Sequence, residues 1–264
     1  MGTRASIATL AVALGGCALA IDASDLRAGT SLAYENAVAA DTPIDFYTMH
    51  DPAGSPAPAN AVTASQDTAT MQGASLTGSA ASFDGAAAIN LGEGYDFTGT
   101  ASYSLEAWVQ QVALDGPTAV LFEDGTLDED TGAKYGYDVT LTNTESTTTP
   151  GDLVGGFGRS AGASSSCGIA FDYPPTSGFY LAAVYDGTQL TVYVDGAVAG
   201  QGCGGAQSVT LASPMQPSDS TLWLGADPNG DEGFSGLVSE VAIYAVPLMA
   251  QQVSTHYMAG QSGP

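Results

Sequence analysis

The sequence predicts an all-β protein built from short strands and many turns. The 264 residues include 34 glycines and 13 prolines, which favour turns over helices. Segment 103–110 alternates with period two, which indicates a strand with Leu105 and Trp108 on opposite faces. Two β-rich runs within 180–194 flank Asp186-Gly187, and this pattern predicts a hairpin. An all-β unit of this length is commonly one domain.

Other elements follow from local sequence signals. The Pro/Ala/Gly-rich run 52–60 is typical of a loop, and Asp195-Gly196 predicts a turn after the hairpin. A helix is expected only over 246–258, where Pro247 suits a first turn and Gly260 suits the end.

Charge restricts the classes of partner. Hydrophobic residues make up 44% of the chain and mean hydropathy is +0.10, which is enough for a packed core. Only 4 Lys and Arg stand against 28 Asp and Glu, so the formal net charge is −24. Such a chain repels phosphate backbones and anionic headgroups, so nucleic acid is excluded as a partner. The same imbalance favours solubility, tolerance of salt and binding of divalent cations, and the sequence does not rank these.

The N-terminus predicts export. Arg4 precedes a short apolar run over 5–14, the layout of a secretory signal. The run ends in Leu14-Gly-Gly-Cys17, which resembles a bacterial lipobox and makes Cys17 the expected site of lipidation. Residues 1–17 are then a lipoprotein signal and 18–33 a small, polar tether. The expected location is the outer membrane or cell surface, with the membrane contacted through the lipid alone. A plain signal peptide and N-myristoylation are the alternatives.

Cys167 and Cys203 remain once Cys17 carries lipid. An even pair in an oxidising compartment predicts one disulfide between them.

Several separated motifs resemble laminin G-like domains. They occur in the family's order at Tyr34–Met49, Phe83-Asp84-Gly85, 103–109, 180–196 and 222–244. The last contains Leu-Gly, an acidic loop and a strand ending in Glu-Val-Ala-Ile-Tyr. The tryptophan usual before the hairpin is replaced by Gly178-Phe179-Tyr180, and Ser239 replaces the first acid of the closing motif.

This resemblance implies a concanavalin A-like jelly roll, a sandwich of two antiparallel sheets, over 34–260, with 261–264 as a tail. Such domains mostly bind glycans or proteins without chemistry. The expected function is therefore a monomeric, non-catalytic adhesion module that binds carbohydrate or extracellular protein. The inference from fold to function is analogy.

Calcium is the candidate cofactor. Pentraxin relatives of the fold bind calcium through two places that correspond here to acidic stretches 123–130 and 227–231. The resemblance implies Asp128 and Asp130 from the first, with Asp227, Asn229 and Asp231 from the second. Oxygen ligands at alternate positions suit a hard cation. The alternative is that both stretches are solvated turns in an acidic protein.

Aromatic side chains are candidates for stacking on sugar rings. Trp108 and Trp223 lie in expected strands and are interpreted as core, so Tyr135, Tyr137 and Tyr173 are the predicted ligand-binding aromatics.

Two alternatives to a binding module remain. Gly158-Arg-Ser160-Ala-Gly162 has the spelling of a nucleophile elbow, although no helix-forming sequence follows it. A serine hydrolase using Ser160 is thus one alternative, and a structural envelope protein without ligand is the other. A jelly-roll glycanase of the laminarinase type would carry E-x-D-x-x-E on one strand, and that pattern is absent from the sequence. Of the two histidines, His256 beside Tyr257 is interpreted as a packing residue.

Overall fold

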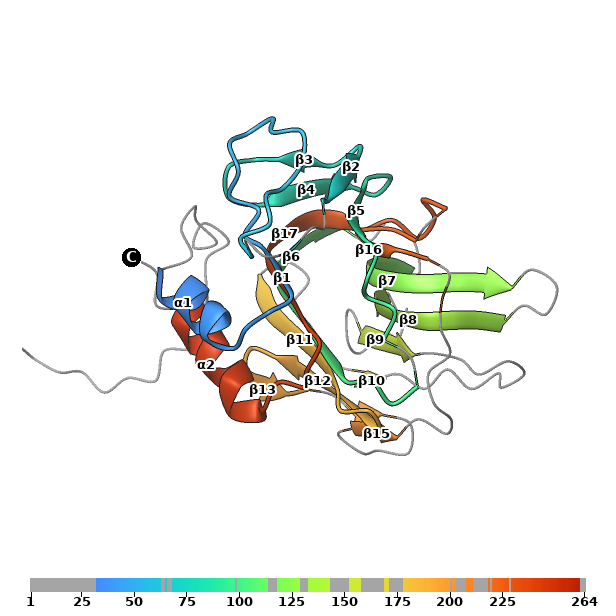
Figure 1. Ribbon diagram of the computed structural model, residues 1–264. Coiled ribbons are helices and arrows are strands. Elements are labelled where there is room, and N and C mark those ends of the chain that lie inside the picture. The colour runs from blue at the N-terminus through green and yellow to red at the C-terminus, as the bar shows by residue number, and fades with distance from the viewer. Residues whose placement is uncertain are drawn as a thin grey trace, which may run out of the picture.

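The computed structural model has the architecture of a β-sandwich with helices on one side (Figure 1). The residues that it describes are 32–62, 65, 68–97, 99–113, 118–128, 133–142, 152–157, 169–170, 178–199, 201–202, 208–210, 218, 220–227 and 229–261.

The described strands form two large antiparallel sheets and one small pair. The nine-stranded sheet has the order β13-β12-β11-β6-β17-β4-β3, with β1 paired to β17 and β15 to β12. Its strands are β1 (Asp45–Tyr47), β3 (Ser75–Leu76), β4 (Ala81–Asp84), β6 (Tyr103–Ala113), β11 (Phe179–Tyr185), β12 (Gln189–Val194), β13 (Ala197–Val198), β15 (Ser208–Thr210) and β17 (Ser235–Tyr244).

The six-stranded sheet has the order β2-β5-β16-β7-β8-β9. Its strands are β2 (Thr70–Gln72), β5 (Ala88–Gly92), β16 (Leu222–Leu224), β7 (Thr118–Asp128), β8 (Ala133–Thr142) and β9 (Asp152–Phe157). Strands β10 (Ile169–Ala170) and β14 (Gln201–Gly202) pair separately. The all-β sandwich expected from the sequence is confirmed.

Alternation along β6 builds two separate hydrophobic layers. Tyr103, Leu105 and Val109 are buried in the core between the sheets, whereas Trp108 is buried on the opposite face. The predicted faces of Leu105 and Trp108 are confirmed, and the reason is the period of two along a strand.

The predicted hairpin is also confirmed. Strands β11 and β12 pair from Leu181 opposite Val194 to Tyr185 opposite Leu190. At the turn, Asp186 Oδ1 accepts the backbone N–H groups of Thr188 and Gln189 at 2.8 and 2.7 Å. A carboxylate that caps its own turn in this way fixes the hairpin register.

Two helices pack on the outer face of the nine-stranded sheet (Figure 1). Helix α2 (Ala250–Gln261) lies four residues later than the predicted start because Val246 to Met249 form the connection from β17. Helix α1 (Leu32–Ala40) was not expected, and it begins inside the segment interpreted as a tether. Tyr34 and Val38 of α1 are buried against Trp108, so α1 belongs to the folded domain.

A buried carboxylate holds the helices to the sheet. Glu106 of β6 has an exposed fraction of 0%. Its Oε1 accepts from Tyr34 Oη at 3.3 Å and Tyr244 Oη at 2.8 Å, while its Oε2 accepts from Tyr180 Oη. His256 Nδ1 of α2 lies 2.9 Å from the same Oε2. These donors come from α1, β17, β11 and α2, and together they satisfy a charge that burial alone would make costly.

His256 extends this set of bonds to a second carboxylate. Its Nε2 lies 2.9 Å from Asp41 Oδ2, just after α1. Burial would lower the pKa of His256, but the hydrogen bond to Glu106 and the charges of Glu106 and Asp41 outweigh it, so the pKa is raised. His256 is buried, as expected, and in addition it links Glu106 of the sheet to Asp41 at the end of α1.

Gly225→Ala tests the close packing of the closing motif. Gly225 has φ +92°, and an added Cβ would meet the Phe83 ring at 2.4 Å. We expect a loss of about 2–5 kcal/mol, the sum of left-handed backbone strain and overpacking of the core. Gly54→Ala is the matched control, since Gly54 has φ +83° and nothing within 4 Å of an added Cβ. Urea denaturation should show a loss of only about 1–2 kcal/mol for this control. Equal losses would contradict the packing argument.

His256→Gln tests the buried network through pH. A histidine with a raised folded pKa contributes stability that is fully present below the unfolded pKa of about 6.5 and is lost as pH rises through the folded pKa. The melting temperature of the variant should therefore lie furthest below that of the parent near about pH 5.5, and the gap should narrow in alkaline solution. Thr255→Ala, at the exposed neighbouring position, should show no such trend. A gap independent of pH would refute the assignment.

Candidate functional site

Several residues predicted from the sequence lie outside the described residues. These are Cys17, Cys167, Cys203, Asp130, Tyr173 and Ser160. Lipidation, the disulfide and the serine-hydrolase alternative therefore stay predictions. Asp128 is described as the last residue of β7, where it pairs with Ala133.

The two halves of the expected calcium site lie at opposite ends of β7. Strand β16 runs antiparallel to β7, so the chain after Leu224 continues towards the start of β7, where Val120 N donates to Glu232 O at 2.7 Å. Asp128 lies at the other end, roughly 26 Å away along an extended strand. The prediction that Asp128 shares one ion with the Asp227 loop is wrong, because 123–128 continues the strand and does not turn back as a loop.

The second half of that site is a self-capped turn. Asp227 Oδ1 accepts the backbone N–H groups of Asn229 at 3.0 Å and Asp231 at 2.6 Å. Asn229 and Asp231 are exposed. The carboxylate of Asp227 thus has a structural role in the turn, of the kind that Asp186 has in the β11–β12 hairpin.

The predicted ligand-binding tyrosines do not form a platform. Tyr137 has an exposed fraction of 3% and lies in the core, where its ring stacks on Tyr103 at 4.6 Å and its Oη donates to Tyr95 O at 3.0 Å. The prediction of Tyr137 as a sugar-binding aromatic is wrong, because β8 directs it inward. Tyr135 also lies on β8, opposite Thr126, and is partly exposed.

A row of polar and aromatic residues crosses the outer face of the six-stranded sheet. Trp223 of β16 pairs with Asn90 of β5 on one side and with Glu123 of β7 on the other, and Glu123 pairs with Asp138 of β8. Residues directly opposite on neighbouring strands project from the same face. Asn90, Trp223, Glu123 and Asp138, here named the outer row, therefore stand side by side.

Burial varies along the outer row. Trp223 rests on Ala88 and Ala226 and exposes 9% of its surface, while Glu123 exposes 2%. Asn90 and Asp138 are partly exposed. Asn90 Nδ2 donates to Thr221 Oγ1 at 2.8 Å, which fixes the amide beside the indole. The row combines an aromatic ring with amide and carboxylate groups, which together suit a ligand that has both apolar faces and hydroxyls.

Sequence reasoning missed this row although one local signal pointed to it. Leu222 and Leu224 are buried in the core, so alternation places Trp223 on the other face of β16. That signal says nothing of Asn90, Glu123 and Asp138, because their neighbourhood depends on strand order.

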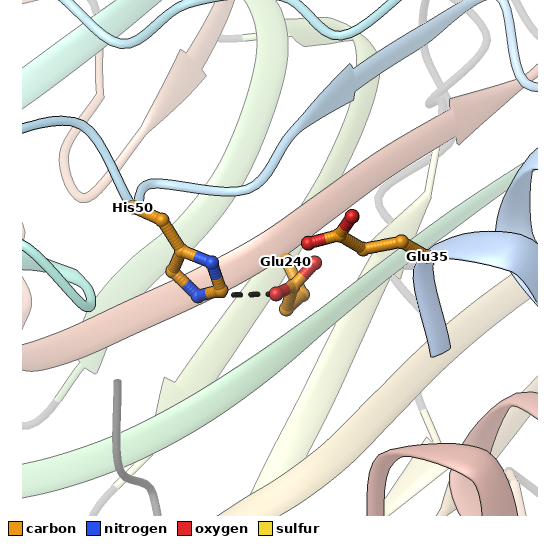
Figure 2. Close-up of side chains that lie close together, drawn as sticks. All are labelled: Glu35, His50 and Glu240. Carbon is orange, nitrogen blue, oxygen red and sulfur yellow. Dashed lines mark ion pairs between the residues drawn. The ribbon is translucent and has the colours of Figure 1, made fainter. Parts of the chain in front are cut away.

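A second cluster joins Glu35, His50 and Glu240, here named the His50 cluster (Figure 2). Glu35 comes from α1, His50 from the chain after β1, and Glu240 from β17. One ligand atom from each residue lies within 4.8 Å of the others, and His50 Nε2 is 3.1 Å from Glu240 Oε1.

Two residues of this region have left-handed backbone conformations. Glu240 has φ 55° at a bulge in β17, and Met49, next to His50, has φ 62°. Such conformations are uncommon for residues other than glycine, and they direct side chains away from the regular alternation.

Burial dominates the protonation of the His50 cluster. It raises the pKa of Glu240 to about 9, with further contributions from the charges of Glu35 and Glu106. It lowers the pKa of His50, and the charges of Glu35 and Asp51 oppose this only in part. At neutral pH without a cation, Glu240 is therefore protonated and His50 is neutral.

None of the helices in the described part of the chain has the length and apolar character that crossing a bilayer requires.

Known structures share the fold at low sequence identity. Domain 4 of an extracellular arabinanase from Geobacillus stearothermophilus, in complex with arabinotriose, is 19% identical with a TM-score of 0.56, covering 81% of this chain and 97% of that one. A Trypanosoma rangeli sialidase in complex with sialic acid is 17% identical with a TM-score of 0.58, and the match covers 81% of this chain and 32% of the sialidase. The binding domain of botulinum neurotoxin DC in complex with rat synaptotagmin II is 11% identical with a TM-score of 0.58, covering 83% and 52%.

The family of the chain follows from a match between its sequence and the sequence model of a protein family. No curated protein matches the sequence. The laminin G model of the concanavalin A-like lectin/glucanases superfamily matches residues 83–254, more than half of the chain. The match includes β6, the β11–β12 hairpin and the closing motif, on which the resemblance in the sequence also depends. The chain belongs to the laminin G type of the concanavalin A-like lectin/glucanase superfamily.

Proposed function

We propose that this chain is a non-catalytic carbohydrate-binding module that binds its ligand at the outer row. The observation that carries the proposal is the placement of Asn90, Trp223, Glu123 and Asp138 on four adjacent strands of one sheet face. Sugars present hydroxyls to amide and carboxylate groups and C–H faces to aromatic rings, and the outer row offers both.

The positions of the two helices favour the outer face of the six-stranded sheet over the outer face of the nine-stranded sheet as the binding surface. Helices α1 and α2 cover the outer face of the nine-stranded sheet through Trp108 and its neighbours. The inner faces of both sheets are filled by the core. Among the described residues, neither helix covers the outer face of the six-stranded sheet, and the exposed residue Thr70 of β2 extends the outer row there beside Asn90.

The structural neighbours support binding of carbohydrate more than of any other ligand class. Domain 4 of the arabinanase is in complex with arabinotriose, and the sialidase is in complex with sialic acid. The neurotoxin binding domain is in complex with synaptotagmin II, a protein. A protein partner is therefore the second candidate ligand, after carbohydrate.

Glycoside hydrolysis is the rival function, and one observation favours it. Glu123 and Asp138 are directly opposed across β7 and β8, beside Trp223. Retaining glycosidases use two carboxyl groups about 5–5.5 Å apart, which is a separation that neighbouring strands provide. The E-x-D-x-x-E pattern of laminarinases places the acids on one strand, so it does not reveal this pair on two strands.

Export and anchoring complete the proposal. The lipobox-like Leu14-Gly-Gly-Cys17 supports a lipid anchor at Cys17 and a cell-surface or outer-membrane location. Cys167 and Cys203 are proposed to form a disulfide there.

Binding at the outer row is tested by a glycan array followed by calorimetry on the strongest ligand. Asn90→Ala and Asp138→Asn should each weaken binding by roughly fivefold, the effect of losing one hydrogen bond worth about 1 kcal/mol. Trp223→Phe should weaken it further because a smaller ring offers less stacking surface.

Gln251→Ala, at an exposed position on α2, is the control and should bind as the parent does. If the bound glycan releases reducing sugar, and Glu123→Gln abolishes that release, the function is hydrolysis and not binding alone. Unchanged affinity in all three outer-row variants would refute the proposed surface.

Calcium dependence is proposed for the Asp227 loop alone. If the folded state binds the ion there, calcium at a hundred times its dissociation constant should stabilise the fold by about 2.7 kcal/mol and raise the melting temperature. Asp227→Ala should abolish this shift. Asp186→Ala is the matched control, because Asp186 caps a turn in the same way as Asp227. If calcium does not change the melting temperature at constant ionic strength, the loop is only a solvated turn.

A further inference from the structure

The His50 cluster has the donor set of a transition-metal site. It offers one imidazole nitrogen and two carboxylates, with a ligand atom of each within 4.8 Å of the others. Two ligands of a tetrahedral zinc ion bound at ~2.0–2.1 Å are about 3.3 Å apart. The observed 3.1 Å between His50 Nε2 and Glu240 Oε1 is close to that separation. Glu35, on the first turn of α1, completes the set with a carboxylate oxygen within 4.8 Å of the other two ligand atoms.

The backbone holds two of these donors in fixed positions. Strand β1 pairs with β17 through Tyr47 opposite Val241, and Glu240 N donates to Thr48 O at 3.2 Å. His50 N in turn lies 3.3 Å from Thr48 Oγ1. The segment that carries His50 is therefore tied to the bulge that carries Glu240. A site held in this way needs little ordering when an ion binds.

Charge and access also favour a cation. Glu35 and Glu240 bring two carboxyl groups together in a chain of net charge −24, and a bound cation would replace the proton that Glu240 carries at neutral pH. The sequences of α1 and β17 contain no lysine or arginine that would compete with the ion. The His50 side chain exposes 21% and Glu35 is partly exposed, so an ion and its water can reach the cluster from solvent. Three protein ligands plus water is a common zinc arrangement.

We propose that Glu35, His50 and Glu240 form a binding site for a divalent first-row transition ion, with Zn²⁺ as the representative ion. Imidazole is a good ligand for zinc and its neighbours, whereas calcium takes oxygen ligands in larger number. This site lies on the helical side of the nine-stranded sheet and is separate from the outer row. It is independent of the proposed glycan binding.

The test is calorimetric titration of the full chain with Zn²⁺ after removal of metal by a chelator, with the cysteines alkylated so that thiols do not compete. Zinc should bind and raise the melting temperature. His50→Gln should weaken zinc binding by more than about 100-fold, since loss of a merely supporting side chain costs about 10–100-fold. Glu35→Gln should also weaken it, and Glu93→Gln, at an exposed glutamate outside the cluster, should leave it unchanged.

Metal-free melting curves of each variant separate a lost site from a lost fold. Should His50→Gln fail to fold, Glu35→Gln decides the matter, because Glu35 is a partly exposed helix residue. Zinc affinity that is unchanged in the folded variants, or a response to Ca²⁺ equal to that to Zn²⁺, would overturn the proposal.

Discussion

The hydrogen bonds of the buried carboxylate of Glu106 are the interactions on which the docking of helices α1 and α2 depends. An isolated charge in this layer would be strongly unfavourable, and the hydroxyls of three tyrosines together with His256 satisfy it. Because these donors lie on α1, β11, β17 and α2, the carboxylate can be satisfied only when both helices are docked. Helix docking and burial of the charge are therefore one event.

This docking has consequences for both candidate sites. It covers the outer face of the nine-stranded sheet, which leaves the outer row on the opposite side of the sandwich. It also fixes the start of α1, where Tyr34 donates to Glu106 and the next residue, Glu35, reaches the His50 cluster. The geometry of the His50 cluster thus depends on a hydrogen bond made by a neighbouring residue.

The sequence by itself determined the local elements. Alternation over 103–110 defined β6 and its two faces, Gly187 marked the β11–β12 turn, and the closing motif identified the family. These features follow from interactions between residues close in the chain, and period and turn chemistry record them. Helix α1 was not predicted because nine residues are too few to form a stable helix in isolation, and packing of Tyr34 and Val38 stabilises it in the fold.

Only the tertiary structure decided which residues meet. It buried Tyr137 in the core, put Asp128 at the far end of β7 from Asp227, and assembled Asn90, Trp223 and Glu123 from three strands. Alternation shows that a strand has two faces, yet it does not say which strands are neighbours or which face a helix will cover. Those choices depend on hydrogen bonds and burial between residues far apart in the chain, and a single sequence carries no local record of them.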